Sequence, residues 1–489
     1  MNTTRGVVGP DPRRWFALAA TLLAAAMDLI DVTIVNVAVP SIRRDLGASP
    51  SEIEWTVAGY ALAFGLLLVT GGRLGDAFGR RRLFLVGVAG FTAASTLCGL
   101  APSPEVLIVA RVVQGGLAAL MVPQILSMIQ VSFPPEERPK AYALYGASVA
   151  IATVSGPLLG GLLVQADLFG LGWRPIFLIN VPVGVATLVA AAALLPESRA
   201  EHAQRFDLAG VGLLSVALML LLYPLVAGPQ IGWPAWTFVS MAASVPLFAL
   251  FAWYQRSEER RGSSPLVPPR LFRHRGFTGG VLVQLAVFSG VTSFFFVLAI
   301  TLQAGLGFSA LHAGLTFLPF SAGIAVASGA AVQLAPRFGR RLPATGALVM
   351  AFGMGAVLFA TGRGGEEPSS WALVPGLVMG GLGIGLVAPT IVTIALANVR
   401  PNDAGSASGV VNTAGQLGGA IGVAVIGVIF FGALPEGPQL AADPRGGFIS
   451  AFRAALWFEV GIYVLSALLM VLLLPKHTPA QGEASPEYR

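Results

Sequence analysis

Charged side chains are scarce in this sequence: only 11% of its 489 residues are Asp, Glu, Lys or Arg. An ordinary soluble domain carries about 25%. Hydrophobic residues make up 55% of the chain, and its mean hydropathy is +0.77. A soluble core cannot hide so much apolar surface, because a water-facing exterior must stay largely polar. The scarcity of charge therefore argues against a soluble protein and predicts an integral membrane protein.

Cysteine is almost absent, since Cys98 is the only one, and lysine occurs only at Lys140 and Lys476. A single cysteine excludes a disulfide framework and a thiolate metal site; we expect Cys98 to be a buried packing residue. The arginines are spread over many short loops, which argues against nucleic-acid binding. The sequence shows no nucleotide-binding loop, zinc-binding HExxH or catalytic triad. We expect no enzymatic activity, cofactor or metal.

Long apolar runs are abundant, and about 20 apolar residues suffice to cross a bilayer. The run 208–255 is too long for one span and is broken by glycines and prolines, so it predicts two helices. Residues 277–336 predict another two, separated near 303–312. The remaining single spans are predicted at 16–40, 54–72, 83–101, 105–130, 141–166, 175–196, 342–362, 370–397, 404–433 and 454–474. The sequence thus predicts an all-α membrane protein with fourteen transmembrane helices.

The basic residues predict the orientation of these helices. With the N-terminus placed in the cytoplasm, twenty-three of the 30 basic residues fall in cytoplasmic segments and six in outer segments, with Arg111 inside a span. The positive-inside rule relates such a bias to topology. We therefore expect both termini to be cytoplasmic.

An internal repeat divides the chain. GGRLGDAFGRRRL at 71–83 aligns with AVQLAPRFGRRLP at 331–343, and each segment follows the second helix of a six-helix unit. Duplicated halves around a central cavity are typical of secondary transporters. We predict an N-terminal bundle (1–200), two inserted helices with a basic cytoplasmic loop (201–275), a C-terminal bundle (276–475) and a cytoplasmic tail (476–489).

Six motifs occur in order along the predicted helices. They are DVTIVNVAVP at 31–40, GRLGDAFGRR at 72–81, RVVQGG at 111–116, GPLLGG at 156–161, WRPIFLINVP at 173–182 and NTAGQLGG at 412–419. Together they resemble the major facilitator superfamily, specifically its fourteen-helix drug:proton antiporter branch. The chain departs from the family pattern at Ala77, Pro336 and Gly415, where basic or acidic residues are usual.

Four ionisable side chains lie at predicted membrane depth: Asp28, Asp31, Arg111 and Glu459. Each costs at least about 2.5–3.5 kcal/mol there, so such residues mark function by default. Asp28 and Asp31 lie one helical turn apart, and two carboxylates this close in a low dielectric do not both ionise readily. One of them is therefore expected to exchange a proton near neutral pH. A polar contact between helices, or a permanently protonated side chain, is the alternative.

The resemblance implies a proton-relay role for Arg111, which would pair with Asp31 when no proton is bound, with Gln114 as a hydrogen-bonding partner. Arginine keeps its charge at physiological pH, so the carboxylate is the group that titrates. A permanent structural ion pair remains the alternative.

Conformational control is implied for the loop motif and the fifth helix. The family motif places Asp76 against the start of the helix that follows Asp403, with an ion pair to Arg80. In the fifth helix, proline bends the backbone and glycines permit close packing. The predicted gating residues are Gly72, Asp76, Gly79, Arg80, Gly156, Pro157 and Gly160.

A substrate cavity is predicted from polar and aromatic residues: Gln114, Glu459, Phe295, Asn412 and Gln416. Three roles are open for Glu459: it recognises a cation in the cavity, it is a second titrating group, or it faces outward near the end of its span. Phe295 belongs to an aromatic group with Phe294, Phe296, Phe317, Phe320, Trp457 and Phe458. This group is expected to line a pocket or to pack against lipid or neighbouring helices.

The expected function is proton-driven export of neutral or cationic lipophilic compounds, such as drugs or antibiotics, across the bacterial cytoplasmic membrane. The C-terminal bundle has no Arg or Lys at membrane depth that would clamp an anion. The alternative is a proton-coupled uptake symporter for a nutrient or siderophore. The protein is expected to act as a monomer with protons, lipid and a small lipophilic substrate as its partners.

Overall fold

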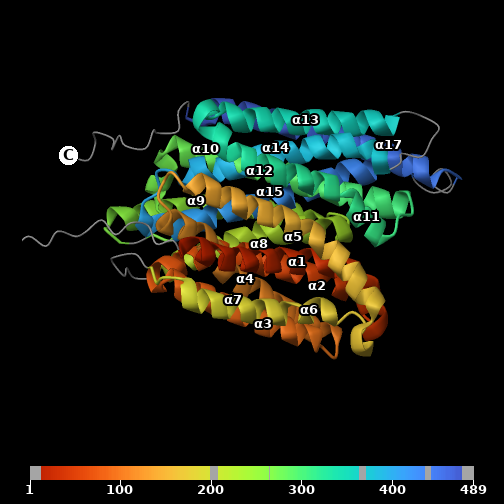
Figure 1. Cartoon of the computed structure of the whole chain (residues 1–489), viewed down its shortest axis with the longest axis horizontal. Coiled ribbons are helices and arrows are strands. Elements are labelled where there is room, and N and C mark those ends of the chain that lie inside the picture. Colours follow the sequence, from red (N-terminus) through yellow and green to blue (C-terminus); the bar gives the residue numbers. More distant parts are fainter. Residues whose placement is uncertain (1–12, 199–206, 264, 363–369, 436–441, 476–489) are drawn as a thin grey trace, which may run out of the picture.

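The computed structural model describes residues 13–198, 207–263, 265–362, 370–435 and 442–475 (Figure 1). Within them, fourteen helical segments are long and apolar enough to cross a membrane. The predicted number of spans is therefore confirmed. The predicted tail 476–489 lies outside the described residues.

The N-terminal half holds α1 (Arg14–Leu46), α2 (Pro50–Phe78), α3 (Arg80–Gly99), α4 (Pro104–Ser132), α5 (Arg138–Ala166), η1 (Leu168–Gly170), α6 (Pro175–Leu178) and α7 (Asn180–Leu194). Next come α8 (Leu208–Ile231), α9 (Ala235–Arg260) and η2 (Pro269–Arg273). The C-terminal half holds α10 (Arg275–Ile300), η3 (Thr301–Gly305), α11 (Ala310–Thr316), α12 (Leu318–Phe338), α13 (Arg341–Gly362), α14 (Ser370–Leu396), η4 (Pro401–Asp403), α15 (Ala404–Ala433) and α17 (Pro444–Leu473).

Each half packs mainly within itself. In the N-terminal half, α1 packs on α5 and α7, while α4 packs on α2 and α3. In the C-terminal half, α14 packs on α12 and α13, while α10 packs on α15 and α17. The halves meet where α2 contacts α15 and where α5 contacts α12 (Figure 1). In Figure 1 the C-terminal helices lie above the N-terminal ones, and short helices α6 and α11 mark one end of the molecule, at the right.

We call the end at which α2 finishes and α15 begins the basic end, and the end with α6 and α11 the opposite end. The inserted helix α8 packs on both α2 and α15, so it lies against the junction between the halves. Its Leu214, Leu218 and Leu222 are buried with Leu62 and Val69 of α2. The inserted pair is therefore an integral part of the fold.

Helix boundaries follow local sequence signals. Helix α1 runs to Leu46, beyond the predicted 16–40, and stops at Gly47, whose φ of 64° suits glycine. Ser49 and Glu52 then form a capping box, with Pro50 in the first turn of α2. The predicted span 175–196 is divided into α6 and α7. A π-helical turn, η3, ends α10 where the sequence predicts a break.

Candidate functional site

A buried ion pair joins α1 to α4 in the N-terminal half. The Arg111 Nη1 atom lies 2.5 Å from Asp31 Oδ2, and the side chains are 1% and 0% exposed. Two charges this deeply buried are tolerated only when they are paired and their remaining hydrogen-bonding capacity is satisfied. The pairing expected from the sequence is present in the structure.

Two amides complete the coordination of Asp31. Gln114 Nε2 and Asn180 Nδ2 donate to Asp31 Oδ1 at 2.9 and 2.7 Å. Arg111 Nη1 donates to Gln114 Oε1 at 2.8 Å, and its Nε donates to the Thr56 carbonyl at 3.1 Å. Three helices, α1, α4 and α7, thus supply the side chains of one network, which we call the Asp31 cluster (Asp31, Arg111, Gln114 and Asn180).

Asp28 lies one turn before Asp31 and is also buried. It accepts a hydrogen bond from the Tyr60 hydroxyl of α2. The guanidinium carbon of Arg111 lies 4.2 Å from the centre of the Tyr60 ring. Two carboxyl groups therefore share the surroundings of one arginine, and the group is electrically neutral when one carboxyl carries a proton.

Sequence reasoning missed Tyr60 and Asn180 as site residues. Asn180 is the amide residue inside the motif 173–182, and Tyr60 is a lone tyrosine in an apolar span. Asn and Tyr side chains need a hydrogen-bond partner when they are buried. Their presence inside predicted spans was therefore the signal that could have marked them as site residues. Cys98 is buried as expected, with its Sγ atom 3.6 Å from Gln114 Oε1.

Helix α5 packs closely on α1 beside the Asp31 cluster. A Cβ atom on Gly156 would lie 1.8 Å from Thr33 Oγ1, and one on Gly160 would lie 2.9 Å from Ile34 Cγ1. Pro157 lies next to Gly314 of α11 in the other half. A Cβ atom added to Gly314 would be 3.5 Å from the Cβ atom of Pro157. Helix α5 therefore links the helix that carries Asp31 to the opposite end of the C-terminal half.

Asp76, near the end of α2, lies against the start of α15, which is the position that the family resemblance implies. Its carboxylate oxygens accept hydrogen bonds from the backbone amides of Gly405 and Ser406, at 2.9 and 3.0 Å. A helix N-terminus attracts negative charge through its free amides and its dipole. Arg80 Nη2 lies 2.6 Å from both Asp76 Oδ1 and the Pro401 carbonyl oxygen. These contacts join the two halves at the basic end.

Two glycines make this contact possible. A Cβ on Gly72 would lie 2.1 Å from the Gly405 carbonyl oxygen, so α2 and α15 touch backbone to backbone. Gly79 has a φ of 108°, which other residues rarely adopt. It turns the chain from α2 into α3 and brings the Arg80 amide 2.9 Å from the Ser198 carbonyl oxygen.

The segment after α9 adds a contact that the sequence did not reveal. Arg270 Nη2 lies 2.9 and 3.1 Å from the two carboxylate oxygens of Asp403, just before α15, and Arg270 Nη1 lies 3.1 Å from Glu259. Ser406 Oγ donates to the Leu266 carbonyl at 3.0 Å. The inserted helices are thereby attached to the same junction that Asp76 holds.

Two further polar contacts between the halves lie at the basic end. Gln130 Nε2 of α4 donates to the Leu396 carbonyl at 2.7 Å. The hydroxyl oxygens of Ser127 and Ser408 lie 3.3 Å apart. The two halves are therefore held together at the basic end by hydrogen bonds, whereas Pro157 and Gly314 meet through apolar atoms.

A different ion pair lies at the opposite end. The Asp45 carboxylate, just beyond the span in α1, accepts hydrogen bonds from Trp173 Nε1 at 2.9 Å and Arg174 Nη1 at 2.6 Å. These hydrogen bonds, that of Arg174 first, lower the pKa of Asp45 below its ordinary value. The first two residues of the motif 173–182 thus tie α1 to the start of α6.

The predicted cavity residues occupy different environments. Gln416 is exposed on α15, and Asn412, one turn earlier, is half-buried and donates to the Ser408 carbonyl at 2.9 Å. Gln114 is fully buried in the Asp31 cluster. Phe295 is half-buried, with its ring centre 4.9 Å from that of Phe320.

Glu459 is 0% exposed, so the alternative in which it faces outward is wrong. It lies inside the C-terminal half, where Ser293 of α10 and Tyr463 of α17 are its hydrogen-bonding partners. Trp457, two residues earlier, is 66% exposed and points away from the aromatic group formed by Phe294, Phe295, Phe317 and Phe320.

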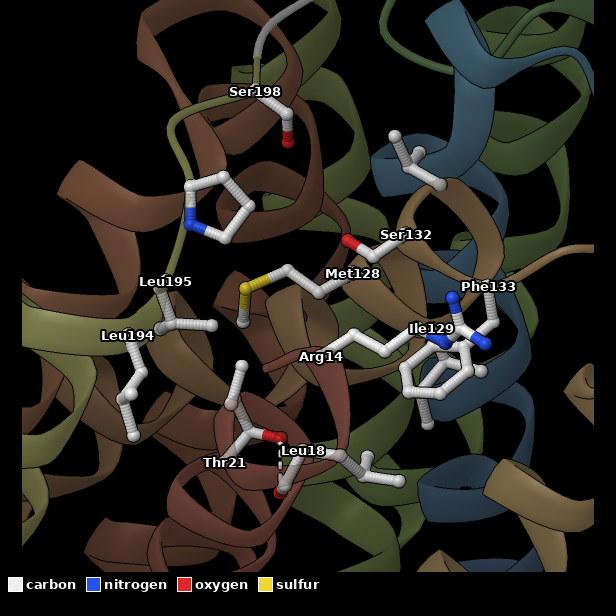
Figure 2. A pocket seen from close by; sticks show the side chains of 13 residues that line it. Arg14, Leu18, Thr21, Met128, Ile129, Ser132, Phe133, Leu194, Leu195 and Ser198 are labelled. Atoms are coloured by element: carbon white, nitrogen blue, oxygen red, sulfur yellow. Dashed lines mark hydrogen bonds between the residues drawn. The ribbon is translucent and has the colours of Figure 1, made fainter. Parts of the chain in front are cut away.

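A cavity of about 260 Å³ lies at the basic end, between α1, the end of α4 and the segment after α7. Figure 2 shows Arg14 and Phe133 on one side of it and Leu194 and Leu195 on the other. None of the predicted cavity residues lines it. Among the described residues, no group of three or more His, Cys, Asp or Glu side chains is arranged to hold a metal ion.

Comparisons with known proteins agree on one family. Residues 21–423 match the model of the Major Facilitator Superfamily. The chain is 46% identical to the probable actinorhodin transporter of Streptomyces coelicolor, over 90% of this chain and 76% of that protein. It is 38% identical to the puromycin resistance protein pur8 of Streptomyces alboniger, over 97% and 94%. The crystal structure of the human organic anion transporter MFSD10 has a similar fold, with a TM-score of 0.65, 16% identity and coverage of 94% and 100%.

Proposed function

The chain belongs to the major facilitator superfamily, with the fourteen-helix drug-resistance and export transporters, and from that premise we propose that it exports lipophilic antibiotics or related compounds in exchange for protons. It is a multi-pass membrane transporter and not an enzyme. Relatives named for export of or resistance to actinorhodin, puromycin and tetracenomycin C support the proposed direction and cargo.

The observation that carries the proposal is the burial of Asp31 against Arg111. While Asp31 is ionised, it holds Arg111, Gln114 and Asn180 and so ties α1 to α4 and α7. A proton on Asp31 removes the charge that holds the arginine, and the ion pair loses most of its strength. Since Gly156 and Gly160 pack α5 on the same part of α1, a change at Asp31 is transmitted to the helix that contacts α11.

We infer that the basic end faces the cytoplasm, because most arginines lie there and the positive-inside rule favours that side. Both chain termini are then cytoplasmic as well. In this conformation, Asp76 and Arg80 hold the cytoplasmic side closed, and Arg270 attaches the segment after α9 to the same junction. The apolar contact at Pro157 and Gly314 has no such polar bonds, so the outer side opens more readily from this state.

The cargo class follows from the chemistry of the second half. The described parts of α10, α12, α14, α15 and α17 place no Arg or Lys midway along their spans, so an anion would find no basic partner. Gln416 and Asn412 offer amides and Phe295 offers an aromatic face. We propose these three as cargo contacts for neutral or cationic lipophilic molecules, and we place Gln114 with the proton site.

The function is tested with inside-out membrane vesicles carrying the protein and an acidic interior. Puromycin and tetraphenylphosphonium serve as probes. Export predicts that the vesicles accumulate a probe and that collapsing the pH gradient releases it. Accumulation in right-side-out vesicles with an acidic exterior, and none in inverted ones, would instead establish the uptake symporter.

Replacing Arg111 with lysine is expected to reduce gradient-driven transport by about tenfold or more. Arg111 reaches Asp31, Gln114 and the Thr56 carbonyl at once, whereas one ammonium group cannot span these positions. Each hydrogen bond lost from a charged group costs about 1.5–3 kcal/mol, and 1.4 kcal/mol is a tenfold change in an equilibrium.

The measurement is the initial rate of probe accumulation at equal protein density. Arg174→Lys is the matched control, since Arg174 also pairs with an aspartate but at the partly exposed opposite end. Equal rates in Arg111→Lys and the wild type would limit Arg111 to a supporting charge.

A further inference from the structure

Glu459 is a buried carboxyl group that the Asp31 cluster does not use. It is 0% exposed in the middle of α17, which packs against α10, α13, α15 and η3. The described residues of these elements bring no charged side chain to it: Arg275 and Arg341 begin α10 and α13. On α17 itself, Arg453 lies six residues earlier, about 9 Å along the axis. Tyr463, one turn further on, is the remaining titratable neighbour.

The contacts of Ser293 bear on the protonation state of Glu459. Its Oγ atom lies 2.6 Å from Glu459 Oε1 and also 2.6 Å from the Ser289 carbonyl oxygen. A serine hydroxyl has one hydrogen and can donate to only one of these acceptors. A buried serine in a helix commonly donates to the carbonyl four residues earlier. A protonated Glu459 satisfies both short contacts at once, since its carboxyl group can donate to Ser293 Oγ while Ser293 donates to the Ser289 carbonyl.

The second carboxyl oxygen supports the same protonation state. Glu459 Oε2 is buried, and besides Ser293 the Tyr463 hydroxyl is the neighbour that bonds the carboxyl group. A carboxylate in that position would be a buried charge with no cationic partner among the described residues packed on α17, which proteins avoid by neutralising the group. The contacts and the burial together favour a protonated Glu459 while the basic end is closed.

We propose that Glu459 is a second proton-binding site, located in the C-terminal half and separate from Asp31, that exchanges its proton during transport. Its complete burial argues against contact with cargo in this conformation. The acid releases H⁺ to water and becomes a carboxylate when movement of α17 against α10 admits water, and it takes H⁺ back from the outer side. The π-helical turn η3, which joins α10 to the next helix and contacts α17, is a place where that movement is readily accommodated.

The site itself is tested without any cargo by infrared spectroscopy of the purified, reconstituted protein during a pH titration. Glu459→Gln retains an amide that donates to Ser293, so the fold is expected to persist, which size-exclusion chromatography checks. The wild type should show a protonated carboxyl band that disappears on raising the pH and is missing from Glu459→Gln. The exposed Glu105→Gln variant is the control and should keep the band. Identical protonated-carboxyl bands in Glu459→Gln and the wild type at every pH would overturn the proposal.

The exchange is tested with tetraphenylphosphonium efflux from proteoliposomes, and this step rests on the proposed function. Two protons exchanged for one monovalent cation move a net charge, so an imposed membrane potential should drive the wild type. Glu459→Gln exchanges one proton fewer and should lose the response to potential while keeping the response to a pH gradient. An undiminished response to potential in Glu459→Gln would refute the second site. If tetraphenylphosphonium efflux by the wild type did not change with the pH gradient, proton-coupled export itself would be refuted, whatever the infrared bands show.

Discussion

Replacing Asp31 with asparagine is expected to reduce pH-gradient-driven efflux to the level of vesicles without the protein. Asparagine preserves the size of the side chain and accepts the hydrogen bonds from Gln114 and Asn180. It cannot bind or release a proton in the physiological range. The measurement is the rate of probe accumulation in inside-out vesicles with an imposed pH gradient.

Stability complicates this variant, because Asp31→Asn leaves Arg111 buried without its counter-charge. Removing one partner of a buried ion pair costs about 3–5 kcal/mol. The double variant Asp31→Asn with Arg111→Gln removes both charges and should recover much of the thermal stability. It should not recover transport, since the proton site at Asp31 has not been restored. Recovery of gradient-driven efflux in the double variant would show that Asp31 serves only to neutralise the arginine.

A matched control exists outside the membrane-spanning segments. Asp45 also pairs with an arginine, Arg174, but its side chain is 47% exposed. Exposed pairs contribute about 0–1 kcal/mol. Asp45→Asn should therefore transport at close to the wild-type rate, and an equal loss in both variants would point to general destabilisation.

Gly72→Ala is expected to prevent closure of the basic end and to abolish most transport. The added Cβ would lie 2.1 Å from the Gly405 carbonyl oxygen, a backbone atom that cannot move aside alone. Overpacking costs about 1–3 kcal/mol, which shifts an equilibrium about 5- to 150-fold. Because only the closed basic end places α2 against α15 in this way, the penalty falls on that state. Gly329→Ala in α12 is the control, since a Cβ there meets no atom within 4 Å.

Closure is measured by disulfide formation between the halves. Ser127 of α4 and Ser408 of α15 approach within 3.3 Å at their hydroxyl oxygens, so cysteines at these positions should be joined on oxidation. The background carries Cys98→Ala to remove the native thiol. Gly72→Ala should slow cross-linking by about tenfold or more, in line with the penalty above. Cross-linking at the wild-type rate in Gly72→Ala would remove this crossing from the gating mechanism.

The sequence predicted the spans well because the bilayer constrains them strongly. Uncharged runs such as those that form α13 and α14 have few alternatives to a membrane helix. Asp31 and Arg111 were identified because charges at membrane depth are costly, and the resemblance to a family supplied their pairing. Asp76 at the start of α15 was placed in the same way, through the loop motif and the preference of helix N-termini for anions.

Other site residues depend on tertiary packing that no local pattern expresses. Tyr60 and Asn180 come from helices far apart in the chain, and each becomes informative only when it faces Asp28 or Asp31. Arg270 looked like one of many basic loop residues, and its contact with Asp403 requires the fold of the inserted helices. For Glu459, burial follows from the side of α17 that it occupies, which the largely apolar sequence around it does not specify.

The most direct measurement is of proton movement driven by cargo alone. Proteoliposomes loaded with puromycin are diluted into a weakly buffered, puromycin-free solution of equal pH, and an external pH-sensitive dye follows the protons. Wild-type protein should take protons from the outside as puromycin leaves, and the double variant Asp31→Asn with Arg111→Gln should take none. Puromycin leaving wild-type vesicles at the same rate with no change in external pH would contradict exchange through Asp31.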